Sequence, residues 1–543
     1  GIHVGIVYLY LNKIFKNRKS IICSVSVLGL LFIYSALAQF SPSIIRAVTM
    51  IGLHILSKHL HLRYDLVSAA SFSALLMLIY NPFYLFNIGF QLSYLAVFTL
   101  GFLLPLANSK IDKLKDKKKY SIVVRILKLF APVVVIQIGL APATAYLFNH
   151  FSIAAFFLNI PVIILAGYII PLGILLIFLS YLGGYLFDFL AFFIELLLQL
   201  MINMNALTAE FAFSSIYVTS PSFNILFLYY TILFFISSET FWIFLRKRFY
   251  KIIVGLILFF IVIAAFIPLI MNEDHVTADI VFVDVGQGDC MHVRTPSGKN
   301  ILIDGGGKTD YDVGKNILLP YLLKNKVSKI DLALVTHLHD DHYKGIASLC
   351  NLMTVERLGI YEANILKQDD ILEETGLNVD NIVYLNKGDK IRIDEDVWIE
   401  VLYPPGYCKE EYKDILNEDE NEYSLIMKVN FKNISILNTG DLGFEGEDKI
   451  VEMYSGHKEN VLKADILKVG HHGSRYSTGD RFLDEVSPKL AVIQVGNNNF
   501  GHPHSDVIDK LRKRDIMVYR NDLGGAILIQ IKDKGIHLKT MLN

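Results

Sequence analysis

The residues best suited to chemistry lie in one short segment that directly follows the apolar run Leu332–Val335. It places three imidazoles and two carboxylates within six residues: His337, His339, Asp340, Asp341 and His342. Histidine and carboxylate together suit Zn²⁺, Mn²⁺ or Fe, so the segment predicts a metal site rather than a packing feature. The spacing divides the ligands between two ions. His337 and His339 can reach one ion, while Asp341 and His342 turn towards a second.

Two further apolar runs end in residues of the same kind. The predicted strand Ile434–Leu437 leads to Asp441, which we expect at a sheet edge, where a carboxylate can bridge two ions. The predicted strand Asp465–Val469 leads to His471, His472 and Ser474. We favour His471 as the ligand and expect His472 and Ser474 to support a ligand or to contact phosphate, but the opposite assignment of the two histidines stays open.

Such a donor set predicts two divalent ions, Zn²⁺ or Mn²⁺. Two ions about 3.5–4 Å apart lower the pKa of a bridging water and clamp phosphoryl oxygens during an in-line displacement. We therefore expect a metal-dependent hydrolase in which Asp341 and Asp441 are the catalytic carboxylates.

Glycine-rich turns upstream carry further candidates. Asp304 precedes two glycines and could orient a metal-binding histidine. Supporting or substrate-contacting roles are also open for other polar residues: Asp284, Gln287, Asp289 and His502. Purely structural turns are the competing interpretation. Basic residues near these motifs are Lys344, Lys468 and Arg475.

From Ala278 onward, short β-rich runs alternate with turns and helical stretches, which predicts a soluble α/β domain. Besides those named above, the predicted strands are Asp279–Val285, Lys299–Asp304, Leu332–Thr336, Leu490–Val495 and Ala526–Ile531. The predicted helices include Gly314–Lys324 and Asp506–Lys513.

The first 271 residues have a different composition. They hold 19 Lys+Arg and 7 Asp+Glu, a net charge of +12, whereas residues 272–543 hold 32 and 45, a net of −13. A membrane crossing requires ~20 mostly apolar residues. Stretches of about this kind are Ile21–Phe40, Leu66–Tyr80, Phe83–Leu106, Ile126–Leu147, Ile153–Leu182, Tyr185–Leu207, Phe223–Phe244 and Ile252–Met271. A polytopic helical membrane domain, residues 1–271, is therefore expected before the soluble domain, residues 272–543.

Orientation follows from basic clusters, which favour cytoplasmic loops. The clusters are Lys13–Lys19, Lys110–Lys119 and Arg246–Lys251. One more crossing after the last cluster predicts an extracytoplasmic C-terminal domain. Ile44–Leu62 is amphipathic, which favours an interfacial helix, with a tilted crossing as the alternative. Three apolar segments between the first two clusters would then require one re-entrant segment.

Polar residues at membrane depth are candidates for lining a channel: Asn87, Gln91, Asn149 and Asn159. The last of these precedes Pro161, where we expect a broken helix. Hydrogen bonding between helices without any transport role is an equal alternative.

The HxHxDH motif at residues 337–342, the later Asp441 and the histidine pair resemble the metallo-β-lactamase superfamily. That resemblance implies an αβ/βα sandwich with a dinuclear site between its sheets. The order of the motifs, together with Gly89–Tyr94 and Ser41–Ala47 in the membrane half, is similar to the ComEC family of competence channel proteins. Tyr94 stands where that family usually has Phe, and we expect the family's N-terminal OB-like part to be absent from this sequence.

The resemblance implies passage of a single DNA strand across the cytoplasmic membrane and degradation of its complement by the metal domain. Its implied partners are DNA, membrane lipid and other components of the uptake machinery. The net charge of −13 in the second half argues against a broad DNA-binding surface there. Two alternatives therefore stay open. One is a membrane-anchored hydrolase of another phosphodiester, and the other is a transporter whose metal domain is structural or only gates the pore.

Overall fold

The protein divides into two compact units, Gly1–Leu269 and Ile270–Asn543. A computed structural model describes residues 2–14, 21–114, 121–181, 183–211, 214–238, 255, 276–406, 408, 410–417, 419–457, 460–532 and 535–542. Several features predicted above lie wholly or partly outside these residues: the three basic clusters, the apolar stretch Ile252–Met271 and the boundary between residues 271 and 272.

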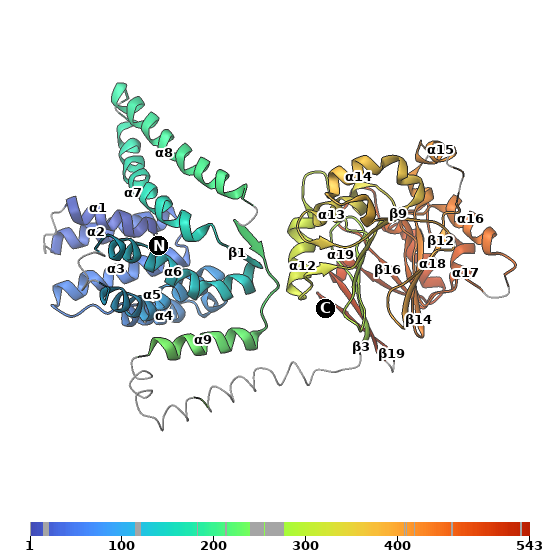
Figure 1. Ribbon diagram of the computed structural model, residues 1–543, viewed down its shortest axis with the longest axis horizontal. Helices are drawn as coiled ribbons and strands as arrows, with labels where there is room; N and C mark the ends of the chain where they lie inside the picture. Colours follow the sequence, from blue (N-terminus) through green and yellow to red (C-terminus); the bar gives the residue numbers. More distant parts are fainter. Residues whose placement is uncertain are drawn as a thin grey trace. The chain divides into compact units, whose positions relative to one another are not determined.

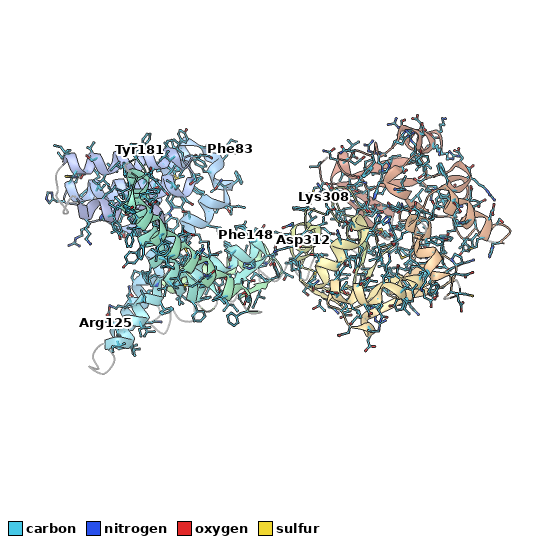
Figure 2. The ribbon with its side chains drawn as sticks, turned by 90° about the horizontal axis from the view of Figure 1, so that it is seen from above. Phe83, Arg125, Phe148, Tyr181, Lys308 and Asp312 are labelled. Carbon is cyan, nitrogen blue, oxygen red and sulfur yellow. The ribbon has the colours of Figure 1, made fainter. Side chains whose placement is uncertain are left out.

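The first unit is helical, as expected (Figure 1). Its helices are α1 (Ile2–Ile14), α2 (Ile21–Leu37), α3 (Pro42–His59), α4 (Leu66–Tyr80), α5 (Ile88–Asp112), α6 (Ser121–Phe148), α7 (Ala155–Leu179), α8 (Tyr185–Ala209) and α9 (Phe223–Ser237). Among the described residues, α5, α6 from Ile122, α7 and α8 are long and apolar enough to cross a membrane. α2, α4 and α9 are shorter apolar helices. Figure 2 places Arg125 on the N-terminal part of α6, which projects from the other helices of this unit.

The break between α4 and α5 falls where the sequence predicts it. Asn81 ends α4, and its side chain accepts a hydrogen bond from the backbone N–H of Phe83 at 3.0 Å. A 3-10 turn, η1 (Pro82–Phe86), follows and begins with the proline, which lacks an N–H and suits a first helical position. The chain therefore leaves one helix and starts the next within a few residues.

Helix α3 lies inside the bundle. It packs against α1, α2, α4 and α5, and its Ala47, Met50 and Ile55 are buried in two hydrophobic clusters of this unit. An interfacial helix would bury one face only. The packing therefore favours the alternative of a tilted crossing helix.

A short antiparallel pair, β1 (His150–Ser152) with β2 (Ser215–Tyr217), separates α6 from α7 and α8 from α9. The pair fills the gap between the predicted apolar stretches Ile126–Leu147 and Ile153–Leu182, but α7 runs without interruption through Pro161. The broken helix expected at Pro161 was wrong. A proline removes one backbone hydrogen bond, and membrane helices tolerate that loss when neighbouring groups satisfy the freed carbonyl.

The second unit contains two mixed sheets. The first has the order β10-β9-β7-β5-β4-β3-β18-β19 and the second β11-β12-β13-β14-β15-β16-β17. The strands of the first are β3 (Val276–Phe282), β4 (Met291–Arg294), β5 (Asn300–Ile303), β7 (Leu332–Leu334), β9 (Leu358–Tyr361), β10 (Ile382–Leu385), β18 (Ile527–Lys532) and β19 (Gly535–Thr540). Those of the second are β11 (Lys390–Arg392), β12 (Val397–Tyr403), β13 (Ile426–Phe431), β14 (Ile434–Asn438), β15 (Ile466–Lys468), β16 (Leu490–Ile493) and β17 (Met517–Arg520).

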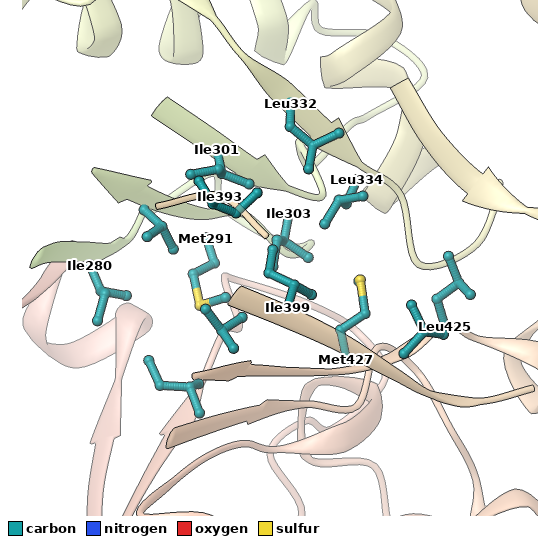
Figure 3. Packing of buried hydrophobic residues seen from close by; sticks show 14 of the residues in the cluster. Ile280, Met291, Ile301, Ile303, Leu332, Leu334, Ile393, Ile399, Leu425 and Met427 are labelled. Atoms are coloured by element: carbon teal, nitrogen blue, oxygen red, sulfur yellow. The ribbon is translucent and has the colours of Figure 1, made fainter. Parts of the chain in front are cut away.

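The sheets pack face to face and are covered by helices on their outer faces. Figure 3 shows Met291 and Ile303 of the first sheet facing Ile399 and Met427 of the second, within one buried cluster. Further clusters lie beneath two sets of helices: α12 (Leu319–Lys324), α13 (Asp340–Cys350) and α14 (Gln368–Thr375) on the first sheet, and α16 (Phe444–Tyr454), α17 (Asp480–Val486) and α18 (Ser505–Lys513) on the second. The second unit is therefore the four-layer αβ/βα sandwich that the motifs imply.

Candidate metal centre

The predicted ligands leave three strands at one edge of the sandwich. β14 and β15 are parallel neighbours, with Asn438 opposite Lys468, so the segments carrying Asp441 and His472 start side by side. The segment that follows β7 meets the second sheet through its backbone, because the N–H of Leu425, directly before β13, donates to the carbonyl of Thr336 at 2.9 Å. Gly440 lies where the two sheets meet. It has φ +49, and a Cβ there would press on Thr336 and Ser424.

Helix α13 presents the acidic end of the HxHxDH motif. His339 stands at its N-cap position without a capping side-chain bond, and Asp341 occupies the first turn, where the helix dipole favours a carboxylate. Two backbone bonds hold the helix against the preceding turn. Gly305 N–H donates to His342 O at 2.7 Å, and Gly345 N–H donates to Gly306 O at 2.8 Å.

Four side chains converge as candidate ligands of one ion: Asp341, His342, Asp441 and His472. One donor atom from each lies within 4.8 Å of all the others. The Nε2 atom of His472 is 3.2 Å from Asp341 Oδ2 and 3.3 Å from Asp441 Oδ2. Two nitrogens and two carboxylate oxygens at this spacing match the ligand preference of Zn²⁺ or Mn²⁺.

Orphaned buried atoms support this fit. His342 Nε2 and Asp441 Oδ1 are 3.2 Å apart, yet both lack a hydrogen-bond partner in the described part of the chain. Buried polar atoms almost always have a partner, and a shared ion would supply it for both.

A second position lies beside the first. His337 Nε2 is 3.1 Å from His339 Nδ1, and the rings of His337 and His342 have centroids 4.2 Å apart. Burial, with the charge of His342 next in importance, lowers the pKa of His337 well below its ordinary value. A neutral imidazole is the form that binds metal. His337 and His339 therefore suit a second ion.

His342 is oriented by a residue of the preceding turn. Its Nδ1 lies 3.1 Å from Asp304 Oδ2, and Asp304 is itself held by the backbone N–H of Thr336 at 2.8 Å. Hydrogen bonding through Nδ1 leaves Nε2 free for an ion. Burial acts to lower the pKa of His342, but Asp441 and Asp304 outweigh it and raise the pKa to about 10.

The histidine pair divides its roles by backbone conformation. His471 and His472 have φ +48 and +53, a left-handed arrangement that points the two rings in different directions. His472 turns inward, where its Nδ1 lies 2.9 Å from the carbonyl oxygen of Gln494. His471, which the sequence favours as the ligand, is 31% exposed, with Nε2 3.9 Å from Asp441 Oδ2. His472 thus occupies the place in the four-residue group that we expected for His471.

A buried lysine is the main feature that the sequence does not predict. Lys468, at the end of β15, is fully buried and pairs with Asp289. Its Nζ also donates to Gly440 O at 2.8 Å and lies 3.7 Å from Asp441 Oδ1. Its signal was a single charge inside the apolar run Ile466–Val469. Lys468 is therefore internal, whereas Lys344 and Arg475 are exposed, paired with Asp340 and His504.

The remaining candidates in this unit lie nearby with smaller roles. Asp284 is exposed and accepts from the Gly286 N–H at 3.1 Å within its own turn. Gln287 accepts from the Gly496 N–H at 3.3 Å, which joins this turn to the segment after β16. Ser474 is buried and accepts from the backbone of the next turn. His502 stacks edgewise on His471 with ring centroids 5.6 Å apart.

Three of the four channel candidates make hydrogen bonds to described residues. Asn87 caps α5 by accepting from the Phe90 N–H at 3.0 Å, and Gln91 donates to Leu85 O at 2.8 Å. Asn149 is buried and donates to Val218 O and to Ser220 Oγ, joining α6 to the segment after β2. Asn159 lies half-buried on α7.

Metal binding should release protons at pH 7. Asp441 and Asp289 raise the pKa of His472 well above its ordinary value against the effect of burial, and His342 titrates at about 10, so both imidazoles are protonated before an ion arrives. Both must lose a proton to bind it. Calorimetric titration of Mn²⁺ in buffers with different ionisation enthalpies should give a heat that changes with the buffer. A heat independent of the buffer would contradict this account.

Two protein families match the chain, one in each of its two units. A model of the Competence protein family matches residues 1–243, and one of the metallo-beta-lactamase superfamily matches residues 283–403. ComE operon protein 3 of Bacillus subtilis (strain 168) is 30% identical over 573 residues, which cover 98% of this chain and 67% of that protein. Competence protein ComA of Neisseria gonorrhoeae is 29% identical over 254 residues, covering 47% and 32%.

Two solved structures are similar to part of the chain. A possible metal-dependent hydrolase from Veillonella parvula DSM 2008 has a TM-score of 0.31 and 14% identity, and covers 46% of this chain and 99% of that one. A long form RNase Z from yeast has a TM-score of 0.33 and 8% identity, and covers 49% and 50%.

Proposed function

The chain belongs to the ComEC family of competence proteins, and from this membership we propose that it carries a single DNA strand across the cytoplasmic membrane while its second unit hydrolyses phosphodiester bonds of the other strand. The first unit is a multi-pass membrane domain and the second a metallo-β-lactamase-type domain. Uptake of DNA is the role that both parts support.

The observation that carries the hydrolase proposal is the group of four converging donors, Asp341, His342, Asp441 and His472. We propose that it holds one ion, and that His337 and His339 hold a second with Asp441 shared between them. Two bound ions would supply a hydroxide at neutral pH and positive charge for the phosphoryl oxygens. Asp304 and the Gln494 carbonyl then orient the two imidazoles, and Lys468 with Asp289 holds Asp441 in place.

The acidic charge of the second half also favours a second candidate function, the hydrolysis of a small phosphodiester. With a net charge of −13, residues 272–543 have no general attraction for DNA, so a small phosphodiester could be the substrate instead. In that case the purified chain would cleave such an ester and leave DNA intact. Cleavage of DNA would favour the main proposal.

We place the second unit outside the cytoplasm. Counting α3 as a crossing helix gives four helices, α2 to α5, between the first two basic clusters, and four more, α6 to α9, lead to the third. Both numbers are even, so all three clusters share the cytoplasmic side without a re-entrant segment. The apolar stretch 252–271 then leads to the opposite face.

Cys408 offers a test of this placement. It is exposed on the second unit, whereas Cys290 is buried and Cys350 is half-buried. We expect a membrane-impermeant maleimide to label the chain in intact protoplasts, and Cys408→Ser to remove that label. Labelling that requires lysis of the protoplasts would place the unit in the cytoplasm.

The proposed function as a whole is tested by uptake of labelled DNA into cells that carry variant chains. Loss of the metal centre through Asp441→Asn should leave the complementary strand undegraded. A strain in which both the imported strand and its complement behave as in the wild type would contradict the proposal.

A further inference from the structure

The two motifs of the membrane unit meet around one charged side chain. Ser41–Ala47 opens α3, and Gly89–Tyr94 opens α5. Ser43 Oγ donates to Gly89 O at 3.3 Å, and Arg46 Nε donates to Ser93 Oγ. Two segments more than forty residues apart in the sequence are thereby joined at Arg46.

Neutral groups surround the Arg46 guanidinium. It lies over the ring of Tyr94, 5.9 Å from the centroid, and its Nη1 is 3.7 Å from Met50 Sδ. Tyr94 is buried and shares a hydrogen bond of 2.8 Å with Ser73 of α4. The positive charge therefore points towards helices α4 and α5 rather than away from the bundle.

No carboxylate forms an ion pair with Arg46 among the residues that the structure describes. The acidic residue nearest to α3 in sequence, Asp65, instead caps α4 by accepting from the Ser68 N–H at 2.7 Å. Arg46 lies four residues after Pro42, ~6 Å along α3, and its side chain is partly buried. A cation held between apolar helices is costly unless it meets an anion, a carbonyl or water, and charged residues in membrane helices usually face the bundle interior or a hydrated path.

We propose that Arg46 binds a phosphodiester group in the membrane unit, and that this group belongs to the DNA strand in transit. The guanidinium fork fits two phosphate oxygens, and Ser93 and Tyr94 hold it in place. The assignment to DNA rests on the proposed function, whereas the phosphodiester chemistry rests on the unpaired cation alone.

Space for the bases lies beside the same helix. Ile45, Val48 and Thr49 of α3 form one wall of a cavity of about 450 Å³. Its other walls include four aromatic rings: Phe32, Phe40, Tyr80 and Tyr84. Aromatic rings bind unpaired bases of any sequence by stacking, so an aromatic cavity on the helix that carries Arg46 suits single-stranded DNA.

The test compares charge-removing variants of the full chain. Arg46→Gln removes the proposed ligand, and Lys58→Gln removes an exposed charge near the other end of α3 as a matched control. The chain is purified in a maltoside detergent, which has no phosphate, and EDTA prevents cleavage of the probe. Binding of a labelled oligothymidylate is measured by fluorescence anisotropy, and binding of phosphatidylglycerol by native mass spectrometry.

We expect Arg46→Gln to raise the dissociation constant for the oligonucleotide ~10-fold or more, which is the effect of losing a charge-assisted hydrogen bond. It should also reduce the slope of log K against the logarithm of the salt concentration by about one. Lys58→Gln should change the constant by less than ~3-fold. Arg46→Lys, which keeps the charge without the fork, and Ser93→Ala, which removes its anchor, should give intermediate values. If Arg46→Gln does not fold, these two variants still test whether Arg46 binds the oligonucleotide.

If Arg46→Gln loses phosphatidylglycerol binding but binds DNA as the wild type does, the phosphodiester group belongs to a lipid headgroup. That result would overturn the DNA assignment. No effect on either ligand would overturn the phosphodiester site itself. A wild-type chain that binds no oligonucleotide would refute the proposed function, and its lipid binding would then decide whether Arg46 holds a phosphodiester at all.

Discussion

Replacing Asp441 with Asn is expected to lower the rate of metal-dependent phosphodiester cleavage by ~10³-fold or more. Its two oxygens face His342 on one side and His472 on the other, 3.2 Å and 3.3 Å away. An amide offers one weak oxygen ligand in place of a shared carboxylate. Bound metals contribute several kcal/mol to such reactions, and each 1.36 kcal/mol corresponds to a factor of ten in rate.

The measurement is cleavage of labelled DNA and of a chromogenic phosphodiester by the purified chain with Mn²⁺ or Zn²⁺. Asp340→Asn is the matched control, because Asp340 belongs to the same motif but is half exposed and paired with Lys344 at 2.6 Å. We expect it to keep the rate within ~3-fold, since exposed pairs of this kind are worth little. An Asp441→Asn chain that cleaves as fast as the Asp340→Asn chain would exclude a role for Asp441 in catalysis.

Replacing Lys468 with Met is expected to destabilise the second unit by about 3–5 kcal/mol when no metal is present. Lys468 and Asp289 are both buried, and removing one partner of a buried pair leaves the other charge uncompensated. Asp441 lies close as well, so two carboxylates lose their nearby cation. Added metal should recover part of the loss by binding the folded state only.

Denaturation can be followed through Trp398 of β12 in a Trp242→Phe background, which restricts the signal to the second unit. The double variant Lys468→Met with Asp289→Asn should lose less stability than the two single variants combined, because it removes both charges. Lys344→Met should cost less than ~1 kcal/mol, as for other surface pairs. If the double variant loses as much stability as the two single variants combined, Lys468 and Asp289 do not interact.

The sequence predicts the second unit well because each chemical motif directly follows an apolar run. β5, β7, β14, β15, β16 and β18 fall within a few residues of their expected positions, and η3 (Gly314–Leu318) with α12 covers the expected first helix. Parallel strands bring their carboxyl ends to one edge, so the convergence of Asp441 and His472 follows from topology alone. Competence and metallo-β-lactamase relatives confirm the family that the motifs indicate.

Orientation of side chains could not be predicted in this way. His471 and His472 are chemically equal in the sequence, and only the left-handed backbone between Gly470 and Gly473 turns His472 inward. The pairing of Lys468 with Asp289 joins residues 179 positions apart and depends on the way the two sheets meet. Neither feature leaves a periodic pattern in the sequence from which it could be predicted.

The membrane unit was harder to predict for a physical reason. Hydropathy identifies apolar segments, but α3 carries Arg46, His54 and Lys58, so its composition favours a surface helix. Packing inside a bundle allows such residues to face polar partners on neighbouring helices. Asn87 and Gln91 bond instead to groups a few residues away along the chain, and Asn149 bonds to Val218 and Ser220.

Anomalous diffraction from crystals of the full chain soaked in Mn²⁺ would examine the metal centre most directly. We predict two peaks about 3.5–4 Å apart. One should lie among Asp341, His342, Asp441 and His472, and the other beside His337 and His339. Peaks elsewhere, or no peak within ligand distance of Asp441, would contradict the dinuclear centre from which the hydrolase function is inferred.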